Sequence, residues 1–157
     1  LARFDVRSAR TQTIGSSAIM KWIVSPSQFA QSVDGETIKE AIAKALVDAS
    51  DLKERIARRI ADYANIPAIP VPSPIVETFM DAATDATIIE VRSHDRPALL
   101  FGIGDVITKS QVDIRSAIVT TLGAEAIDTL YVTEIGGGAL SVDRAHDLAA
   151  RLTAALA

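Results

Sequence analysis

The sequence lacks cysteine altogether, which excludes disulfide bonds and thiol chemistry. Aromatic residues make up only 4% of the chain, and the two histidines are His94 and His146. A metal site needs several His, Asp or Glu side chains that converge, and no second histidine lies within helical reach of either one, so we expect no metal. The absence of cysteine also fits a reducing compartment, and we expect a cytoplasmic protein.

Long apolar runs and an excess of basic charge are missing as well. No stretch approaches the roughly 18 apolar residues of a membrane span, and no basic leader with an apolar run opens the chain. The net charge is −4, without a basic stripe, which argues against nucleic acid as a partner. The 157 residues, 48% of them hydrophobic, suffice for one ordinary domain or two small ones.

What the sequence does contain is an internal repeat. The segment Phe4–Ala9 (FDVRSA) returns 108 positions later as Val112–Ala117 (VDIRSA), and the correspondence continues without a gap over about 22 positions. In each copy, alternating polar and apolar residues predict a strand, a glycine predicts a turn, and a second apolar run predicts the return strand. We therefore expect residues 4–25 and 112–133 to be equivalent β-hairpins.

The elements before the second hairpin follow from local patterns. Thr87–Val91 is β-branched and apolar, which predicts a strand. Asp95 can cap a helix whose first turn contains Pro97. The apolar residues of this helix fall on one face at helical spacing, and they are Leu99, Leu100, Ile103, Val106 and Ile107.

After the second hairpin, Gly136–Gly138 predicts a turn, and Ser141 can cap a last helix. The apolar stripe of this helix consists of Ala145, Leu148, Leu152 and Leu156. The order from residue 87 is therefore β-α-β-β-α, which is the ferredoxin-like split unit without its final strand.

The first copy is incomplete at its other end, because it opens on the hairpin and lacks the preceding strand and helix. Asp34 can cap a helical pattern over 36–64, with a break expected near 49–51. An extended linker is predicted by Pro67, Pro70, Pro72 and Pro74. Residues 75–80 would then be the fourth strand of this first unit. A unit without its first strand leaves a central position of the sheet empty, so we expect the chain to be part of a longer protein.

These patterns predict an α+β fold of tandem ferredoxin-like βαββαβ units. The first unit covers residues 1–83 and lacks its first strand and helix, whereas the second covers 84–157 and lacks its last strand. Open strand edges pair readily with other strands. We therefore expect either a dimer or a close association of the two units, with exchange of the 75–80 strand as one route.

The residues also carry a family resemblance. The segment Ile89–Leu100 (IEVRSHDRPALL) resembles the first strand and helix start of ACT domains. The segment 112–132, which includes TLG and DTLYV, resembles the last ACT repeat of the PII-protein uridylyltransferase family. Together with the Pro-rich linker, the resemblance covers essentially the whole chain. One departure is Ala98, because the family usually has glycine after the Asp-Arg-Pro motif.

The resemblance implies a regulatory role. Enzymes of this family add UMP to a PII signal protein, or AMP in some actinobacteria, and remove it. A nucleotidyltransferase domain and a metal-dependent phosphohydrolase (HD) domain do that chemistry, with Mg²⁺ and a nucleoside triphosphate expected for the parent enzyme, while the C-terminal ACT pair senses glutamine. We expect neither catalytic residues nor a cofactor in this chain. The implied partners are glutamine, the parent's catalytic domains, the PII protein and a second copy of the chain in a homodimer.

The candidate ligand site is the turn before the helix of the second unit. Free N–H groups at a helix N-terminus can hold a carboxylate, and Asp95 can hold an ammonium, so the turn suits an amino acid. An ordinary capped helix start would use the same residues. A strand of a neighbouring unit, around 114–116 or 6–8, would form a wall of the site. The expected ligand-binding residues are His94, Asp95, Arg96, Pro97, Ala98, Leu99, Leu100, Ile114, Arg115 and Ser116.

Three functions remain open from the sequence. The chain could be the glutamine-sensing part of a PII-modifying nucleotidyltransferase. It could instead be a stand-alone tandem-ACT protein with another amino-acid ligand, or a dimerisation module whose ligand loop has decayed, which the alanine at position 98 would fit.

Overall fold

A computed structural model describes residues 4–26, 35–48, 50–64, 71–81 and 83–157 of the protein. In chain order, the elements are β1 (Phe4–Ile14), β2 (Ser17–Pro26), α1 (Gly35–Val47), α2 (Ser50–Ala64), β3 (Ile75–Phe79), β4 (Thr87–His94), α3 (Leu99–Lys109), β5 (Val112–Leu122), β6 (Glu125–Glu134) and α4 (Val142–Leu156). The predicted break in the long helical pattern is confirmed, because α1 ends at Val47 and α2 begins at Ser50. Asp34, Pro67 and Pro70 lie outside the described residues.

The chain divides into two compact units. One consists of residues 1–5 and 24–70 and contains α1 and α2. The other consists of 6–23 and 71–157 and contains helices α3 and α4 with nearly the whole sheet, so we call it the sheet unit. None of the described helices is both long and apolar enough to cross a membrane.

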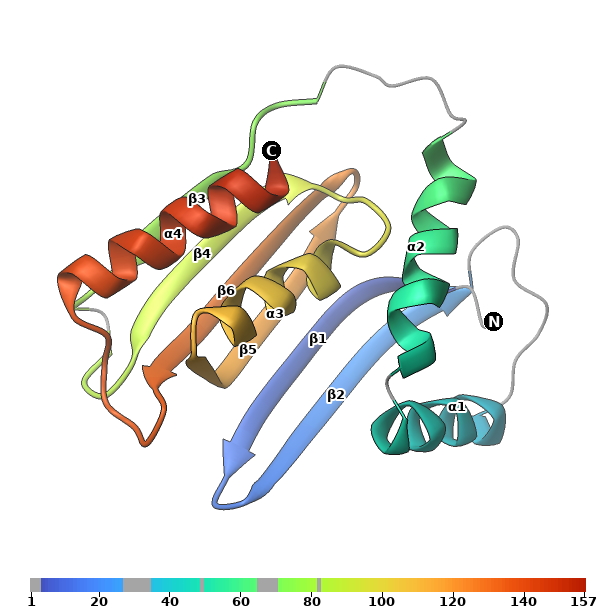
Figure 1. Ribbon diagram of the computed structural model, residues 1–157, viewed down its shortest axis with the longest axis horizontal. Helices are drawn as coiled ribbons and strands as arrows, with labels where there is room; N and C mark the ends of the chain where they lie inside the picture. The colour runs from blue at the N-terminus through green and yellow to red at the C-terminus, as the bar shows by residue number, and fades with distance from the viewer. Residues whose placement is uncertain (1–3, 27–34, 49, 65–70, 82) are drawn as a thin grey trace. The chain divides into compact units, whose positions relative to one another are not determined.

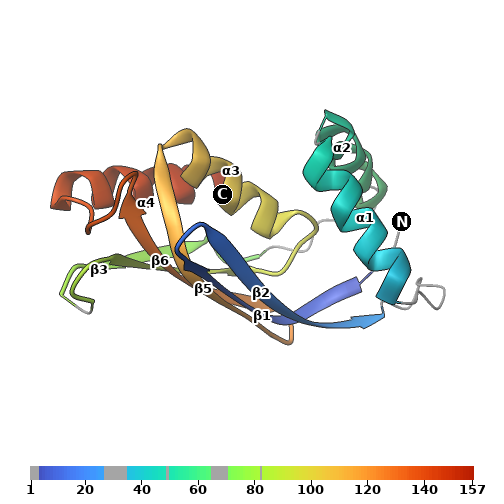
Figure 2. The same ribbon diagram turned by 90° about the horizontal axis from the view of Figure 1, so that it is seen from below.

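The sheet has six strands in the order β2-β1-β5-β6-β4-β3. The pairs β1–β5, β5–β6, β6–β4 and β4–β3 are all antiparallel. Helices α3 and α4 contact each other and lie on one face of the sheet, with α3 against β5 and α4 against β3 and β4 (Figures 1 and 2). From β4 onward the structure therefore has the predicted β-α-β-β-α order of the second unit. The fold is α+β and compatible with tandem ferredoxin-like units.

The internal repeat in the sequence corresponds to a repeat in the structure. The bounds of β5 and β6 follow those of β1 and β2 at the same offset as the repeat. Each turn begins with a glycine in the left-handed region, Gly15 at φ 59° and Gly123 at φ 64°, a conformation that glycine adopts without a Cβ penalty. Strands β1 and β5 pair so that Arg10 lies opposite Ile118, which is its own counterpart in the repeat. The two hairpins are thus joined about a local two-fold axis at this pair.

Strand β3 is placed differently from the sequence-based expectation. We expected residues 75–80 to complete the first unit, but β3 pairs with β4, with Val76 opposite Val91 and Phe79 opposite Ile88. The position beside β4, at the edge of the sheet, is where the final strand of the second unit would lie. Residues 84–157 do not supply that strand, and β3 occupies its place. Val76 also packs against the core beneath the helices. The assignment of this strand to the first unit was therefore wrong, because an open edge of β4 accepts whichever strand reaches it.

The core of the sheet unit lies between the sheet and its two helices. Every second residue of β6 from position 126 to 132 is buried on the helix face, namely Ala126, Asp128, Leu130 and Val132. Helix α4 buries the whole predicted stripe of Ala145, Leu148, Leu152 and Leu156. Ser141 caps this helix as predicted, because its hydroxyl accepts a hydrogen bond from the Arg144 N–H at 3.3 Å.

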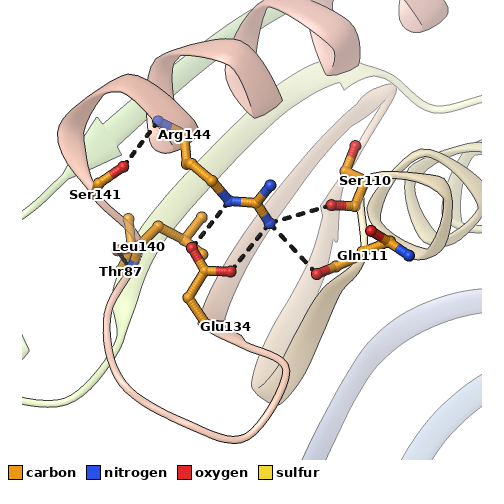
Figure 3. A network of polar contacts seen from close by, with 7 residues as sticks. All are labelled: Thr87, Ser110, Gln111, Glu134, Leu140, Ser141 and Arg144. Carbon is orange, nitrogen blue, oxygen red and sulfur yellow. Dashed lines mark hydrogen bonds and ion pairs between the residues drawn. The ribbon is translucent and has the colours of Figure 1, made fainter.

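A polar network holds the C-terminal end of α3 in place (Figure 3). The Arg144 guanidinium forms two hydrogen bonds, of 2.9 and 3.0 Å, with the Glu134 carboxylate. It also donates to the backbone oxygens of Ser110 and Gln111 in the turn after α3. Gln111 has φ 53°, so the guanidinium holds a backbone turn that an L-residue rarely adopts. The start of α4, the end of β6 and the α3–β5 turn are thereby tied together.

Candidate functional site

The turn between β4 and α3 is fastened to the second hairpin. The Asp95 N–H donates to the Ala124 carbonyl oxygen at 2.8 Å, which fastens the turn to the start of β6. The N-cap residue of α3 is Ala98, in the left-handed conformation at φ 66°, and it makes no side-chain hydrogen bond. The prediction that Asp95 caps this helix was therefore wrong. Asp95 lies three residues before the N-cap residue.

The conformation of Ala98 explains why glycine suits this position. A left-handed backbone costs an L-residue about 1–2 kcal/mol, whereas glycine adopts it freely. The N-cap residue of α3 has no side chain that could accept a hydrogen bond from the first-turn N–H groups of the helix. These groups and the positive end of the helix dipole are therefore suited to an anion such as a carboxylate.

The predicted site residues in and before the turn have different surroundings. The Arg96 guanidinium donates to the Leu156 carbonyl oxygen at 2.8 Å and so caps the end of α4. Leu99 is buried in the core, whereas Pro97 and Leu100 are half-buried. His94 lies opposite Glu125 in the register of β4 against β6. By the alternation along β4, its side chain is on the sheet face opposite the helices.

His94 lines a shallow cavity on that opposite face, away from the first turn of α3. The cavity has a volume of about 370 Å³, and its lining includes Arg92, Glu125 and Ile75. Arg92 is already paired with Glu90 at 2.8 Å, which raises the pKa of the guanidinium through a hydrogen bond and the carboxylate charge. The cavity therefore contains charges of both signs.

The two strand segments that were expected to form the wall of the site lie at opposite ends of β5. Residues Ile114–Ser116 are near the beginning of β5, at a β-bulge, where the Ser116 hydroxyl donates to the Thr11 carbonyl oxygen at 2.9 Å. Arg115 forms an ion pair with Asp85 there. Thr121, at the other end, is about 20 Å further along the strand. Its hydroxyl donates to the Val6 carbonyl oxygen at 2.9 Å, so Val6 lies level with the turn of β5 and β6 that holds Asp95.

Arg7 is the charged residue of this first-copy segment. Ala9 is opposite Val119 on the helix face and is buried, and Arg7 precedes Ala9 by two residues, so it has the same orientation. Its side chain is exposed. The β1 segment that contains Arg7 therefore lies beside the end of β5 that leads into the hairpin turn.

Sequence reasoning missed Asp128. This residue lies in the apolar phase of β6, opposite Val91 and Val119, and it is fully buried on the helix face. Within the described part of the chain, neither of its carboxylate oxygens has a hydrogen-bond partner. Burial, and then the negative charge of Asp95, raises the pKa of Asp128 from 3.8 to about 7. The signal in the sequence was an acidic residue in the phase otherwise occupied by Ala126, Leu130 and Val132.

The described residues do not contain a cluster of three or more His, Asp or Glu side chains that could hold a metal ion. The first turn of α3 offers backbone N–H donors, the turn before it contains Asp95, and the charge of Asp95 acts on the buried Asp128. Groups of this kind recognise charged or hydrogen-bonding parts of a ligand.

Comparison with known proteins identifies relatives of the whole chain. A bifunctional uridylyltransferase/uridylyl-removing enzyme of Streptomyces coelicolor is 33% identical over 161 residues, which covers 98% of this chain and 19% of the relative. Proteins of the same description from Erythrobacter litoralis and Acinetobacter baylyi are 34% and 31% identical, each over 76% of this chain and 13% of the relative. The chain thus spans about a fifth, or less, of the length of these relatives. No protein-family profile matches the chain, and no solved structure is significantly similar to it.

Proposed function

Because this chain belongs to the bifunctional uridylyltransferase/uridylyl-removing enzyme family and corresponds to a part of its members, we propose that it is their glutamine-sensing regulatory module. The parent enzyme would modify the PII nitrogen-signalling protein with UMP, or with AMP, and would remove the group again. This chain would contribute an amino-acid site and transmit its occupancy to catalytic domains elsewhere in the parent protein. The setting of such an enzyme would be the cytoplasm.

The observation that carries the proposal is the first turn of α3, whose N-cap residue makes no side-chain hydrogen bond and which follows a turn fastened to the second hairpin. An amino acid has a carboxylate and an ammonium on one carbon. The N–H groups of this turn, with Arg7 from the neighbouring copy, suit the carboxylate. Asp95 suits the ammonium. Val6–Ser8, rather than Ile114–Ser116, would then form the wall of the site, because only the former segment lies at this end of β5.

Isothermal titration calorimetry with glutamine and a panel of other amino acids tests the proposal. We expect glutamine to bind and Asp95→Ala to weaken binding by roughly 1–3 kcal/mol, because the ammonium would lose its charged partner. Asp113→Ala is the matched control, since Asp113 is an exposed carboxylate at the other end of β5. Equal affinity of both variants would refute the role of Asp95. Absence of binding by the wild-type chain would refute the sensing function.

The alternative of a dimerisation module is supported by one further observation. Strand β2 forms an edge of the sheet, and its apolar side chains are exposed, with Ile19 at 58%, Trp22 at 49% and Ile23 at 53%. An edge of this length and composition pairs readily with another strand. Static light scattering over a concentration series, with and without glutamine, separates the two functions, because a pure dimerisation module would show no response to the amino acid.

A further inference from the structure

Asp128 is a buried acid that the fold does not satisfy. Its carboxyl group is fully buried between the sheet and the helix layer, and both of its oxygens lack a hydrogen-bond partner among the described residues. A buried carboxylate without a partner is strongly unfavourable, so such groups are usually paired or protonated. A side chain of this kind suggests that its partner is supplied from outside the chain.

The position of Asp128 relates it to the start of α3. It is the fourth residue of β6, close to the hairpin turn whose Ala124 carbonyl oxygen accepts the Asp95 N–H. Its side chain points to the face on which α3 lies, and the charge of Asp95 is near enough to act on it. The N-cap residue of α3 makes no side-chain hydrogen bond. The Asp128 carboxyl group therefore lies on the face that α3 covers, within range of the Asp95 charge.

We propose that Asp128 and Asp95 together form the cation-binding half of the ligand site, so that the ammonium group of the ligand is recognised by two carboxyl groups. This inference rests on the proposed function, because it assigns one charged group of the proposed amino-acid ligand to named residues. The helix N-terminus and Arg7 would remain the anion-binding half. A ligand without an ammonium group, even one with the same carboxylate and amide, would then be excluded.

Ligand binding should change the protonation state of Asp128. In the free protein, burial and the charge of Asp95 hold a proton on Asp128, with its pKa near 7. An ammonium that arrives beside the two groups favours the ionised form, so Asp128 releases its proton to solvent while the ammonium keeps its own.

The side chains that surround Asp128 do not obscure this effect. Asp128 lies opposite Val91 on β4 and Val119 on β5, and the residues that α3 buries are Leu99, Ile103 and Ile107, all uncharged. Helix α4 contributes its buried Ala145, Leu148, Leu152 and Leu156 to the same core. The charged groups near this end of the helix face are Asp95, Arg96, whose guanidinium donates to the Leu156 carbonyl oxygen, and the exposed Arg7 on β1.

Calorimetry of the wild-type chain with glutamine at about pH 6.5, in phosphate and in Tris, measures the proton release, because the ionisation enthalpies of these buffers differ. We expect the binding heat to depend on the buffer. Asp128→Asn should abolish this dependence and weaken glutamine binding roughly 10-fold or more, since a charge-assisted contact is lost. The desamino analogue of glutamine, 4-carbamoylbutanoate, should not bind. Asp113→Asn, an exposed neutralisation on β5, should behave as wild type.

The outcomes separate the inference from the proposed function. Glutamine binding with a buffer-independent heat, or unchanged affinity in Asp128→Asn, would overturn the inference and leave amino-acid sensing intact. Equal binding of the desamino analogue would do the same. Failure of the wild-type chain to bind glutamine would overturn both. Fluorescence of Trp22, which lies in β2 of the same sheet, verifies that Asp128→Asn is folded, and the comparison of buffers on the wild-type chain needs no variant.

Discussion

Replacement of Asp128 by asparagine should change how the stability of the free protein depends on pH. The carboxyl group is fully buried, and its pKa is raised from 3.8 to about 7 in the folded state by burial and by the charge of Asp95. The folded state therefore binds more protons than the unfolded state between these two values. By linkage, wild-type stability should fall as the pH rises from about 4 to about 7 and should be level above that range.

The size of the effect follows from the shift. A difference of about three pKa units corresponds to roughly 4 kcal/mol of stability lost above pH 7, which is an upper limit because the fold can relax around the charge. Asp128→Asn has no such group to ionise. Its stability relative to wild type should therefore increase by up to about 3 kcal/mol between about pH 4.5 and about pH 8. The buried amide has a cost of its own, but that cost does not depend on pH.

Urea unfolding followed by Trp22 fluorescence measures this difference in the sheet unit. The informative quantity is the wild-type free energy of unfolding subtracted from that of the variant, at each of several pH values. Asp113→Asn serves as the control, because it makes the same substitution at an exposed position of the same sheet. A constant difference between Asp128→Asn and wild type across the range would refute the assignment of a buried, protonated carboxyl group.

Three further outcomes are expected. Ala98→Gly should raise the free energy of unfolding by about 1 kcal/mol, measured by urea titration, because glycine relieves the left-handed backbone at φ 66°; a loss of stability would contradict this. Arg96→Ala should cost about 1 kcal/mol and speed hydrogen exchange in the last turn of α4, since the Leu156 carbonyl oxygen loses its donor; unaltered exchange there would exclude the capping role. Joint replacement of Trp22 and Ile23 by lysine should lower self-association in light scattering, because both are exposed on the edge strand β2; unchanged mass at every concentration would place the association elsewhere.

Only part of the candidate site could be predicted from the sequence. The turn of Asp95 could be found, because an Asp-Arg-Pro segment before an apolar helix is a local pattern. The role of Arg96 could not, since its partner is the carbonyl oxygen of Leu156, sixty residues away. Nor could the sequence choose between the segments at residues 6–8 and 114–116, because that choice depends on the register of β1 against β5.

The sequence by itself determined the elements whose causes are local. The repeat, both hairpins with their glycine turns, the Ser141 cap and the buried stripe of α4 all follow from periods of 2 and 3.6 residues and from backbone preferences within a few positions.

Only the tertiary structure decided which groups far apart in the chain meet. It paired β3 with β4, joined the hairpins at Arg10 and Ile118, and enclosed Asp128 beneath the helix layer near Asp95. Each of these results depends on which strand edge is open and on how much of a charged group is removed from water. Both quantities are sums over the whole fold, so no local pattern of residues contains them.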